Sequence, residues 1–178
     1  PRQRVPCGCG CFPAGWPLAS LLKQPGNGSI FKAAPDDPAL ITFTSGSSGV
    51  PKGANRTHGF LLAQYKALKT EFPYEPDDID MPMFPVFALN NIAGIRTSVI
   101  PEMNFKKLAD IRPDIIYKQM VENDVTTATA SPLFFDKLSD YLSTQNLKLP
   151  KLRRILTGGA PVQDDRLIKW QQSFDTTE

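Results

Sequence analysis

Two kinds of apolar pattern alternate along this chain, and few folds accommodate that alternation. Short runs rich in β-branched residues are typical of β-strands. Such runs, or extended apolar segments of similar length, occupy residues 39–44, 79–84, 125–130 and 154–157. The segments between them repeat apolar residues at every third or fourth position, which predicts helices with one buried face. Alternating strands and helices predict an α/β fold whose strands pair mainly in parallel.

Each predicted helix has a recognisable start. Thr57 can cap one helix, Pro113 suits the first position of another, and the pair Ser131-Pro132 opens a third. Residues 84–100 carry few charges, and we expect them to be buried. The predicted buried faces of the helices consist of Leu61, Tyr65, Leu68 and Phe72; Ile116 and Met120; Phe134, Leu138 and Tyr141; and Leu167, Trp170 and Phe174.

The composition excludes several classes of protein. The 178 residues include 20 Lys+Arg and 18 Asp+Glu, a net charge of +2, whereas nucleic-acid-binding domains usually carry a strong basic excess. Hydrophobic residues make up 41% and charged residues 21%, which is too apolar for a disordered chain. The sequence has no apolar run near the roughly 20 residues that span a bilayer. We therefore expect a globular protein without nucleic-acid partners and without a transmembrane segment, its oligomeric state left open.

The first 34 residues form a leader to which no domain is assigned. Proline and glycine interrupt its apolar stretch repeatedly, so it makes a poor signal peptide. The cysteines lie here as Cys7-x-Cys9-x-Cys11, a spacing that differs from the usual C-x-x-C of metal sites. Reduced thiols and a metal site are the two interpretations of this motif. Because the chain begins with Pro1 rather than Met, we expect it to be processed or cut from a longer protein.

A loop rich in Ser and Gly lies between the first predicted strand and the first predicted helix. Residues 44–53 read Thr-Ser-Gly-Ser-Ser-Gly-Val-Pro-Lys-Gly. Glycines let backbone N–H groups approach a ligand closely, hydroxyls add donors and Lys52 adds positive charge, which together suit phosphate oxygens. The Walker pattern fails because Pro51 precedes the lysine and Gly53 follows it. A flexible linker is the alternative, although linkers do not normally follow an apolar strand.

This loop, followed by Thr57-His58, resembles the signature loop of the adenylate-forming, or AMP-binding, superfamily in its acyl-CoA synthetase type. Residues 152–161, Leu-Arg-Arg-Ile-Leu-Thr-Gly-Gly-Ala-Pro, resemble the strand and adenine-side turn of the same superfamily. Many acyl-CoA synthetases carry a histidine within the segment that matches residues 84–89, and this chain has none there. A closer resemblance, to the branch of fatty-acid CoA ligases that includes olefin β-lactone synthetases, rests on residues 84–89, 98–101 and 130–132.

The resemblance implies a reaction in which a carboxylate attacks the α-phosphate of ATP, giving acyl-AMP and pyrophosphate. The implied carboxylate is a fatty or β-hydroxy fatty acid, with a long-chain acyl group expected. In the full-length protein the acyl group would then form acyl-CoA or a β-lactone. The implied cofactors are ATP and Mg²⁺, with CoA as a candidate acceptor, and the implied location is the cytoplasm. A non-catalytic nucleotide-binding or interaction module is the alternative from another class of protein.

The resemblance also implies roles for individual residues. Lys52 would stabilise phosphate charge as the candidate catalytic residue, and it would bind the ATP phosphates together with Thr44, Ser45, Gly46, Ser47, Ser48 and Gly49. The implied adenine site consists of Gly159, Ala160 and Pro161, and the implied acyl pocket of Phe84, Phe87, Leu89 and Gly158. Phe84, Phe87 and Leu89 have a plain core role as their alternative. His58 is either catalytic or a surface residue at a helix start, and we interpret Tyr65 and Trp170 as core residues.

Parts of the superfamily pattern do not occur in this chain. The Tyr-Gly-x-Thr-Glu motif, whose glutamate helps to hold Mg²⁺, is absent. Thr177-Glu178 imitates its end, but no Tyr-Gly precedes this pair and no role is carried over. The ribose-binding aspartate, the hinge and the C-terminal domain with its catalytic lysine are absent as well. We therefore expect residues 35–178 to be part of a large N-terminal adenylation domain, without a metal ligand and inactive alone.

Overall fold

The computed structural model describes residues 20, 22–23, 25–26, 28–44, 52–105 and 107–174. Their centre is a four-stranded sheet in the order β4-β3-β5-β6. As the sequence predicts, its strands pair in parallel, so the class is α/β. Its strands are β3 (Ile79–Pro82), β4 (Thr97–Ser98), β5 (Thr127–Ala130) and β6 (Arg154–Thr157).

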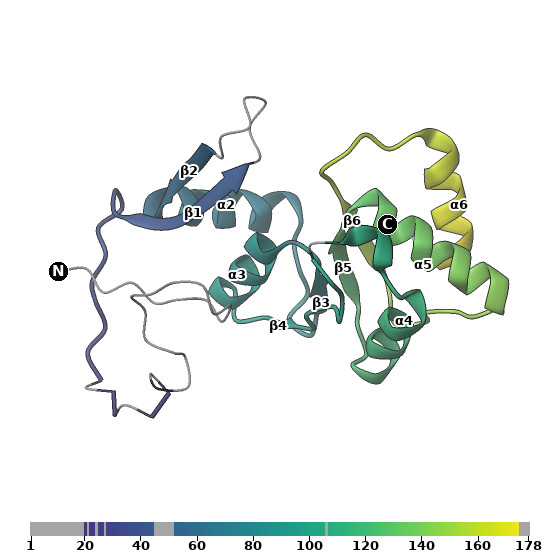
Figure 1. Cartoon of the computed structure of the whole chain (residues 1–178), viewed down its shortest axis with the longest axis horizontal. Coiled ribbons are helices and arrows are strands. Elements are labelled where there is room, and N and C mark those ends of the chain that lie inside the picture. Colours follow the sequence, from purple (N-terminus) through teal and green to yellow (C-terminus); the bar gives the residue numbers. More distant parts are fainter. Residues whose placement is uncertain are drawn as a thin grey trace.

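Helices cover both faces of this sheet (Figure 1). One face meets α4 (Pro113–Glu122), α5 (Pro132–Gln145) and α6 (Asp164–Phe174). The opposite face meets α2 (His58–Glu71) and α3 (Pro85–Ala93). A short 3-10 helix, η1 (Leu108–Asp110), leads into α4.

The hydrophobic core lies on the α4–α6 side. Phe135 of α5 is fully buried, and its ring centre lies 5.5 Å from that of Phe134, 5.7 Å from Trp170 and 5.9 Å from Phe174. Such edge and tilted contacts between buried rings are favourable beyond the area that they bury. Trp170 is thus a core residue, as predicted. Leu167, expected on the same buried face of α6, is instead 43% exposed.

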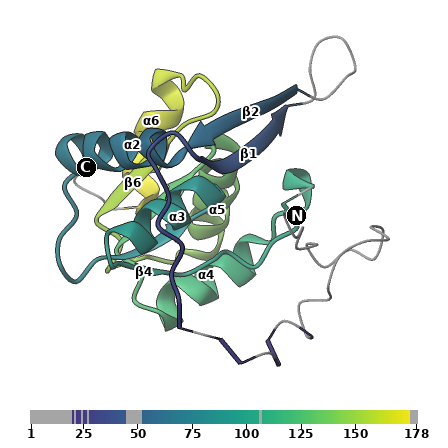
Figure 2. The same ribbon diagram turned by 90° about the vertical axis from the view of Figure 1, so that its left-hand side faces the viewer.

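A separate antiparallel hairpin precedes the parallel sheet. It consists of β1 (Pro38–Thr44) and β2 (Lys52–Thr57). The sequence predicts β1, but it predicts no strand between the loop and the helix that Thr57 caps, where the structure has β2. The register pairs Phe43 with Gly53 and Ile41 with Asn55. The residues of β2 are therefore held in a strand by their hydrogen bonds to β1. Figure 2 shows the hairpin projecting from the rest of the molecule.

The predicted helix starts are confirmed, with one difference of detail. Thr57 Oγ1 accepts a hydrogen bond from the N–H of Phe60 at 3.2 Å and so caps α2. Pro113 and Pro132 occupy the first turns of α4 and α5. The hydroxyl of Ser131 lies 3.5 Å from the sulfur of Met83, so in the described structure this side chain does not cap α5.

The expectation that residues 84–100 are buried is wrong. This segment forms α3, the turn after it and β4, and only the face of α3 toward the sheet is buried. Ile92 is 70% exposed and Ile95 is 96% exposed. Low charge alone predicted burial here, but a helix on the outside of a layer buries only one stripe of its residues.

Candidate functional site

The carboxyl ends of the parallel strands meet at one edge of the sheet, where ligands of α/β proteins commonly bind. There β3 leads through Phe84 into α3, and β6 ends at Thr157 and continues as Gly158-Gly159. Gly159 has φ = +87°, a conformation that L-amino acids with side chains rarely adopt. A Cβ atom at this glycine would lie 3.6 Å from Cζ of Phe84, so the turn passes close to the aromatic ring.

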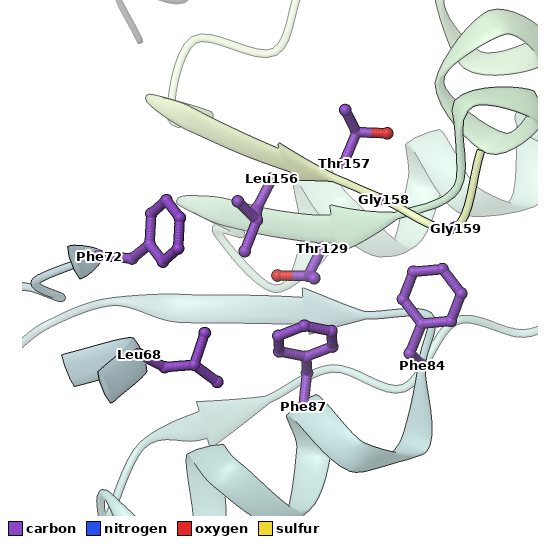
Figure 3. A pocket seen from close by; sticks show the side chains of 9 residues that line it. All are labelled: Leu68, Phe72, Phe84, Phe87, Thr129, Leu156, Thr157, Gly158 and Gly159. Atoms are coloured by element: carbon purple, nitrogen blue, oxygen red, sulfur yellow. The ribbon is translucent and has the colours of Figure 1, made fainter. Parts of the chain in front are cut away.

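A cavity of about 440 Å³ opens beside this edge, on the α2 and α3 side of the sheet. Figure 3 shows Phe87 pointing from α3 toward Thr129 and Phe84 pointing toward the turn at Gly159, with Phe72 at the end of α2. The walls are therefore mainly aromatic and aliphatic. The lining residues are Leu68, Phe72, Phe84, Phe87, Thr129, Leu156, Thr157, Gly158 and Gly159.

The structure brings three of the four residues of the predicted acyl pocket to this cavity. Phe84 and Phe87 contribute neighbouring rings with centres 6.1 Å apart, and Gly158 lies at the end of β6. Leu89 instead lines a second cavity of about 360 Å³ between β1, α2 and α3. The helical spacing explains this, because Leu89 follows Phe87 by two positions and so points to a different side of α3.

The predicted adenine site lies at the first cavity, and His58 lies at the second. Gly159 of the predicted adenine site lines the first cavity, and Ala160 and Pro161 follow it in the exposed loop before α6. His58, the first residue of α2, is exposed and lines the second cavity together with the half-buried Tyr65.

The predicted phosphate site is described only at its two ends. Thr44 and Lys52 are paired in register, so the hairpin holds the beginning and the end of the loop side by side. Lys52 is exposed. Ser45, Gly46, Ser47, Ser48 and Gly49 lie outside the described residues, as do Cys7, Cys9 and Cys11.

A buried polar network under α3 was missed by the sequence interpretation. Asp80 on β3 and Asn91 on α3 have no exposed surface, and Asn91 Nδ2 donates a hydrogen bond to Asp80 Oδ2 at 2.7 Å. Burial raises the pKa of Asp80 above its usual range, although hydrogen bonds from Asn91 and Thr127 act in the opposite direction. The sequence did offer a signal, because Asp80 is a charged residue within a segment predicted to be an extended strand. A carboxylate buried in a sheet needs hydrogen-bond partners, so such a residue indicates a polar network.

Next to this network, a tyrosine and an arginine stack on each other. The guanidinium carbon of Arg96 lies 3.7 Å from the ring centre of Tyr74, a cation–π distance. Burial is the main cause that raises the pKa of Tyr74, and the neighbouring Asp80 carboxylate raises it further. Asp80 therefore has ionisable neighbours in Tyr74 and Arg96.

Two features are absent from the described part of the chain. Its residues contain no group of three or more His, Cys, Asp or Glu side chains that could hold a metal ion. No helix within these same ranges has the length and apolar character needed to cross a membrane.

Solved structures share this fold. The O-succinylbenzoate coenzyme A synthetase of Bacillus subtilis, in complex with AMP, superposes with a TM-score of 0.71 at 17% identity, covering 87% of this chain and 32% of that one. A fatty acyl-adenylate ligase from L. pneumophila, in complex with acyl adenylate and pyrophosphate, gives a TM-score of 0.66 at 19% identity, covering 83% of this chain and 27% of that one. At these identities the likeness concerns the fold alone.

Sequence relatives are more similar. An olefin β-lactone synthetase of Xanthomonas campestris pv. campestris is 39% identical over 136 residues, covering 76% of this chain and 24% of the relative. A second olefin β-lactone synthetase, of Stenotrophomonas maltophilia, is 37% identical over 153 residues, covering 85% of this chain and 27% of the relative. The chain thus spans about a quarter of the length of these relatives. Residues 12–178 match the sequence model of the AMP-binding enzymes, and the chain therefore belongs to that family.

Proposed function

We propose that the full-length protein that carries this chain activates a fatty or β-hydroxy fatty carboxylate with ATP. The observation that carries the proposal is the aromatic cavity at the carboxyl edge of the sheet, beside the Gly158-Gly159 turn. An apolar chain is removed from water in such a cavity, while its carboxylate end stays at the edge where strands and turns end. Relatives named olefin β-lactone synthetase support the acid class.

In the proposed reaction, a carboxylate oxygen forms a bond to the α-phosphorus of ATP as the bond from that phosphorus to the bridging oxygen of pyrophosphate breaks. Both reactants are anionic, so donors and positive charge must hold the phosphates in line with the attacking oxygen. Lys52 would supply the charge, and Thr44 with residues 45–49 would supply hydroxyl and N–H donors. The pairing of Thr44 with Lys52 supports this role, because it holds the two ends of this segment side by side.

The adenine would lie along Gly159, Ala160 and Pro161, and the acyl chain against Phe84 and Phe87. Mg²⁺ bound with ATP would neutralise phosphate charge, but the described residues include no cluster to hold it, so they receive no role toward the metal. The acyl carbonyl of the mixed anhydride is then open to attack, with AMP as the leaving group. The thiol of CoA would give an acyl-CoA, and the β-hydroxyl of the same acyl group would give a β-lactone.

The test is exchange of labelled pyrophosphate into ATP by the full-length protein, with carboxylic acids of graded length, with and without a β-hydroxyl group. We expect exchange that long-chain acids stimulate most. Absence of exchange with every acid would refute the proposal and favour a non-catalytic nucleotide-binding module. Product analysis with and without CoA then separates thioester from lactone. We expect no turnover from the 178-residue chain alone.

A further inference from the structure

A row of polar side chains crosses the sheet beneath α3. Asp80 pairs in register with Ser98 on β4 and with Thr127 on β5, and residues that pair in this way point to the same face of a sheet. Asp80 Oδ1 accepts a hydrogen bond from Thr127 Oγ1 at 2.9 Å. The row therefore presents a buried carboxylate to the underside of the helix.

One side chain of α3 completes this row. Asn91 Nδ2 donates to Asp80 Oδ2 at 2.7 Å and to Ser98 Oγ at 3.0 Å. A buried carboxylate or amide that loses its partner costs the full desolvation penalty of the group. Sliding or turning α3 on the sheet would separate Asn91 from Asp80, so these two bonds fix the position of the helix.

The strands that carry this polar row also lead to the cavity. Thr129 and Leu156 are paired in register two residues beyond Thr127, on the same face, and both line the cavity. Two residues of a strand advance about 6.6 Å. Four residues of a helix advance about 6 Å, and Phe87 lies four residues before Asn91 on α3. Because α3 returns against the strand direction, the bond from Asn91 to Asp80 brings Phe87 to the level of Thr129. Figure 3 shows the ring of Phe87 facing Thr129.

We propose that Asp80 and Asn91 are a positioning pair that sets how far Phe87 reaches into the cavity, and thereby which acyl chain lengths the protein accepts. This proposal rests on the proposed function. The two residues lie behind the cavity wall and do not touch the acyl chain. They act through the position of α3. The outer side of this helix is exposed at Ile92, so contacts on that side do little to hold the helix in place.

The primary experiment compares two substitutions on α3 of the full-length protein. Asn91→Ala removes the amide that bonds Asp80. Asn90→Ala is the matched control, because Asn90 is also buried but its Oδ1 has no hydrogen-bond partner among the described residues. The measurement is kcat/KM for pyrophosphate exchange with short, medium and long straight-chain acids, together with KM for ATP.

We expect Asn91→Ala to change the ratio of kcat/KM between long and short acids by about tenfold, the effect of a methylene-sized change in an apolar pocket. KM for ATP stays the same, and Asn90→Ala keeps the unaltered ratio. A uniform loss for all acids would show that Asn91 supports the fold only, and it would overturn the proposal.

A reciprocal exchange tests the pair if Asn91→Ala does not fold. Asn91→Asp alone places two carboxylates against each other, which is unfavourable. The double variant Asp80→Asn with Asn91→Asp restores one amide opposite one carboxylate. We expect the double variant to regain the original ratio of kcat/KM, and failure to regain it would contradict the proposal. If Asn91→Ala is active and its ratio of kcat/KM between long and short acids is unchanged, only the positioning role of Asp80 and Asn91 is refuted. If the unaltered protein shows no pyrophosphate exchange, the proposed function itself is refuted.

Discussion

At the scale of single residues, two charged side chains lie in opposite surroundings. Lys52 is exposed at the start of β2, where its charge is solvated and available to a ligand. Asp80 has no exposed surface and depends on hydrogen bonds from Asn91 and Thr127. The first is a candidate for binding an anion, whereas the second acts within the fold.

Replacing Lys52 by Met should weaken ATP binding. The substitution removes the charge but keeps a side chain of similar length. We expect KM for ATP to rise by about tenfold, which corresponds to about 1.4 kcal/mol, while the preference among acids stays the same. Lys66→Met is the control, because Lys66 is exposed on α2. Pyrophosphate exchange at varied ATP measures both, and an unchanged KM for Lys52→Met would contradict the phosphate role.

The buried carboxylate of Asp80 should make stability depend on pH. Because burial raises its pKa in the folded protein above the ordinary 3.8, the proton binds more tightly to the folded state. The free energy of unfolding therefore falls as the pH rises from below 3.8 through the folded pKa. Asp80→Asn lacks this contribution, so its stability relative to the unaltered protein should increase over the same range. Urea unfolding at several pH values measures the difference, and a difference independent of pH would contradict the assignment.

At the scale of elements, the sequence predicted features that depend on a pattern within one segment better than features that depend on contact between two segments. The stripes of α4 and α5 were predicted because their buried residues repeat with the helical period, as Ile116 and Met120 do. The strand β2 was not predicted, because the sequence Lys-Gly-Ala-Asn-Arg-Thr has no strand pattern and depends on pairing with β1. The same limit applies to the site: Phe84 and Phe87 were identified by motif, but Asn91 acquires its role only from Asp80, 11 residues away in sequence.

The start of α2 offers a test at this scale. Thr57→Ala removes the oxygen that accepts from Phe60 N–H, and we expect a loss of about 1 kcal/mol in the free energy of unfolding. Thr57→Ser keeps the oxygen and should retain most of the stability. Thr70→Ala removes a hydroxyl from the other end of the same helix, where it bonds the carbonyl of Lys66, and should cost less. Equal losses at the two ends, by urea unfolding, would contradict the capping role.

At the scale of the whole molecule, the two faces of the sheet differ. The α4–α6 side holds the large buried core. The opposite side ends in an exposed apolar stripe along α3 and its following turn, formed by Leu89, Ile92 and Ile95. Contiguous exposed apolar surface commonly takes part in association. Ile95 also has φ = +55°, where a β-branched residue is unfavourable and asparagine is better tolerated.

The purified chain should therefore self-associate through this stripe. We expect Ile92→Lys combined with Ile95→Asn to reduce the associated fraction several-fold, as sedimentation velocity would measure. Val121→Lys is the control, because it places the same charge at an exposed apolar residue on α4. Equal effects of the two variants would show that net charge, rather than the stripe, controls association.

The projecting hairpin has a consequence for how such a protein can change over time. The hairpin carries Lys52, and the parallel sheet with α3 carries Phe87, so the residues proposed for the ATP phosphates and for the acid belong to different sheets. The proposed adenine site, by contrast, follows β6 of the parallel sheet. Substitutions in one sheet leave the hydrogen-bond ladder of the other intact. With the proposed roles, exchanging residues 85–98 as a cassette would alter the preferred acid and leave the hairpin that carries Lys52 unchanged.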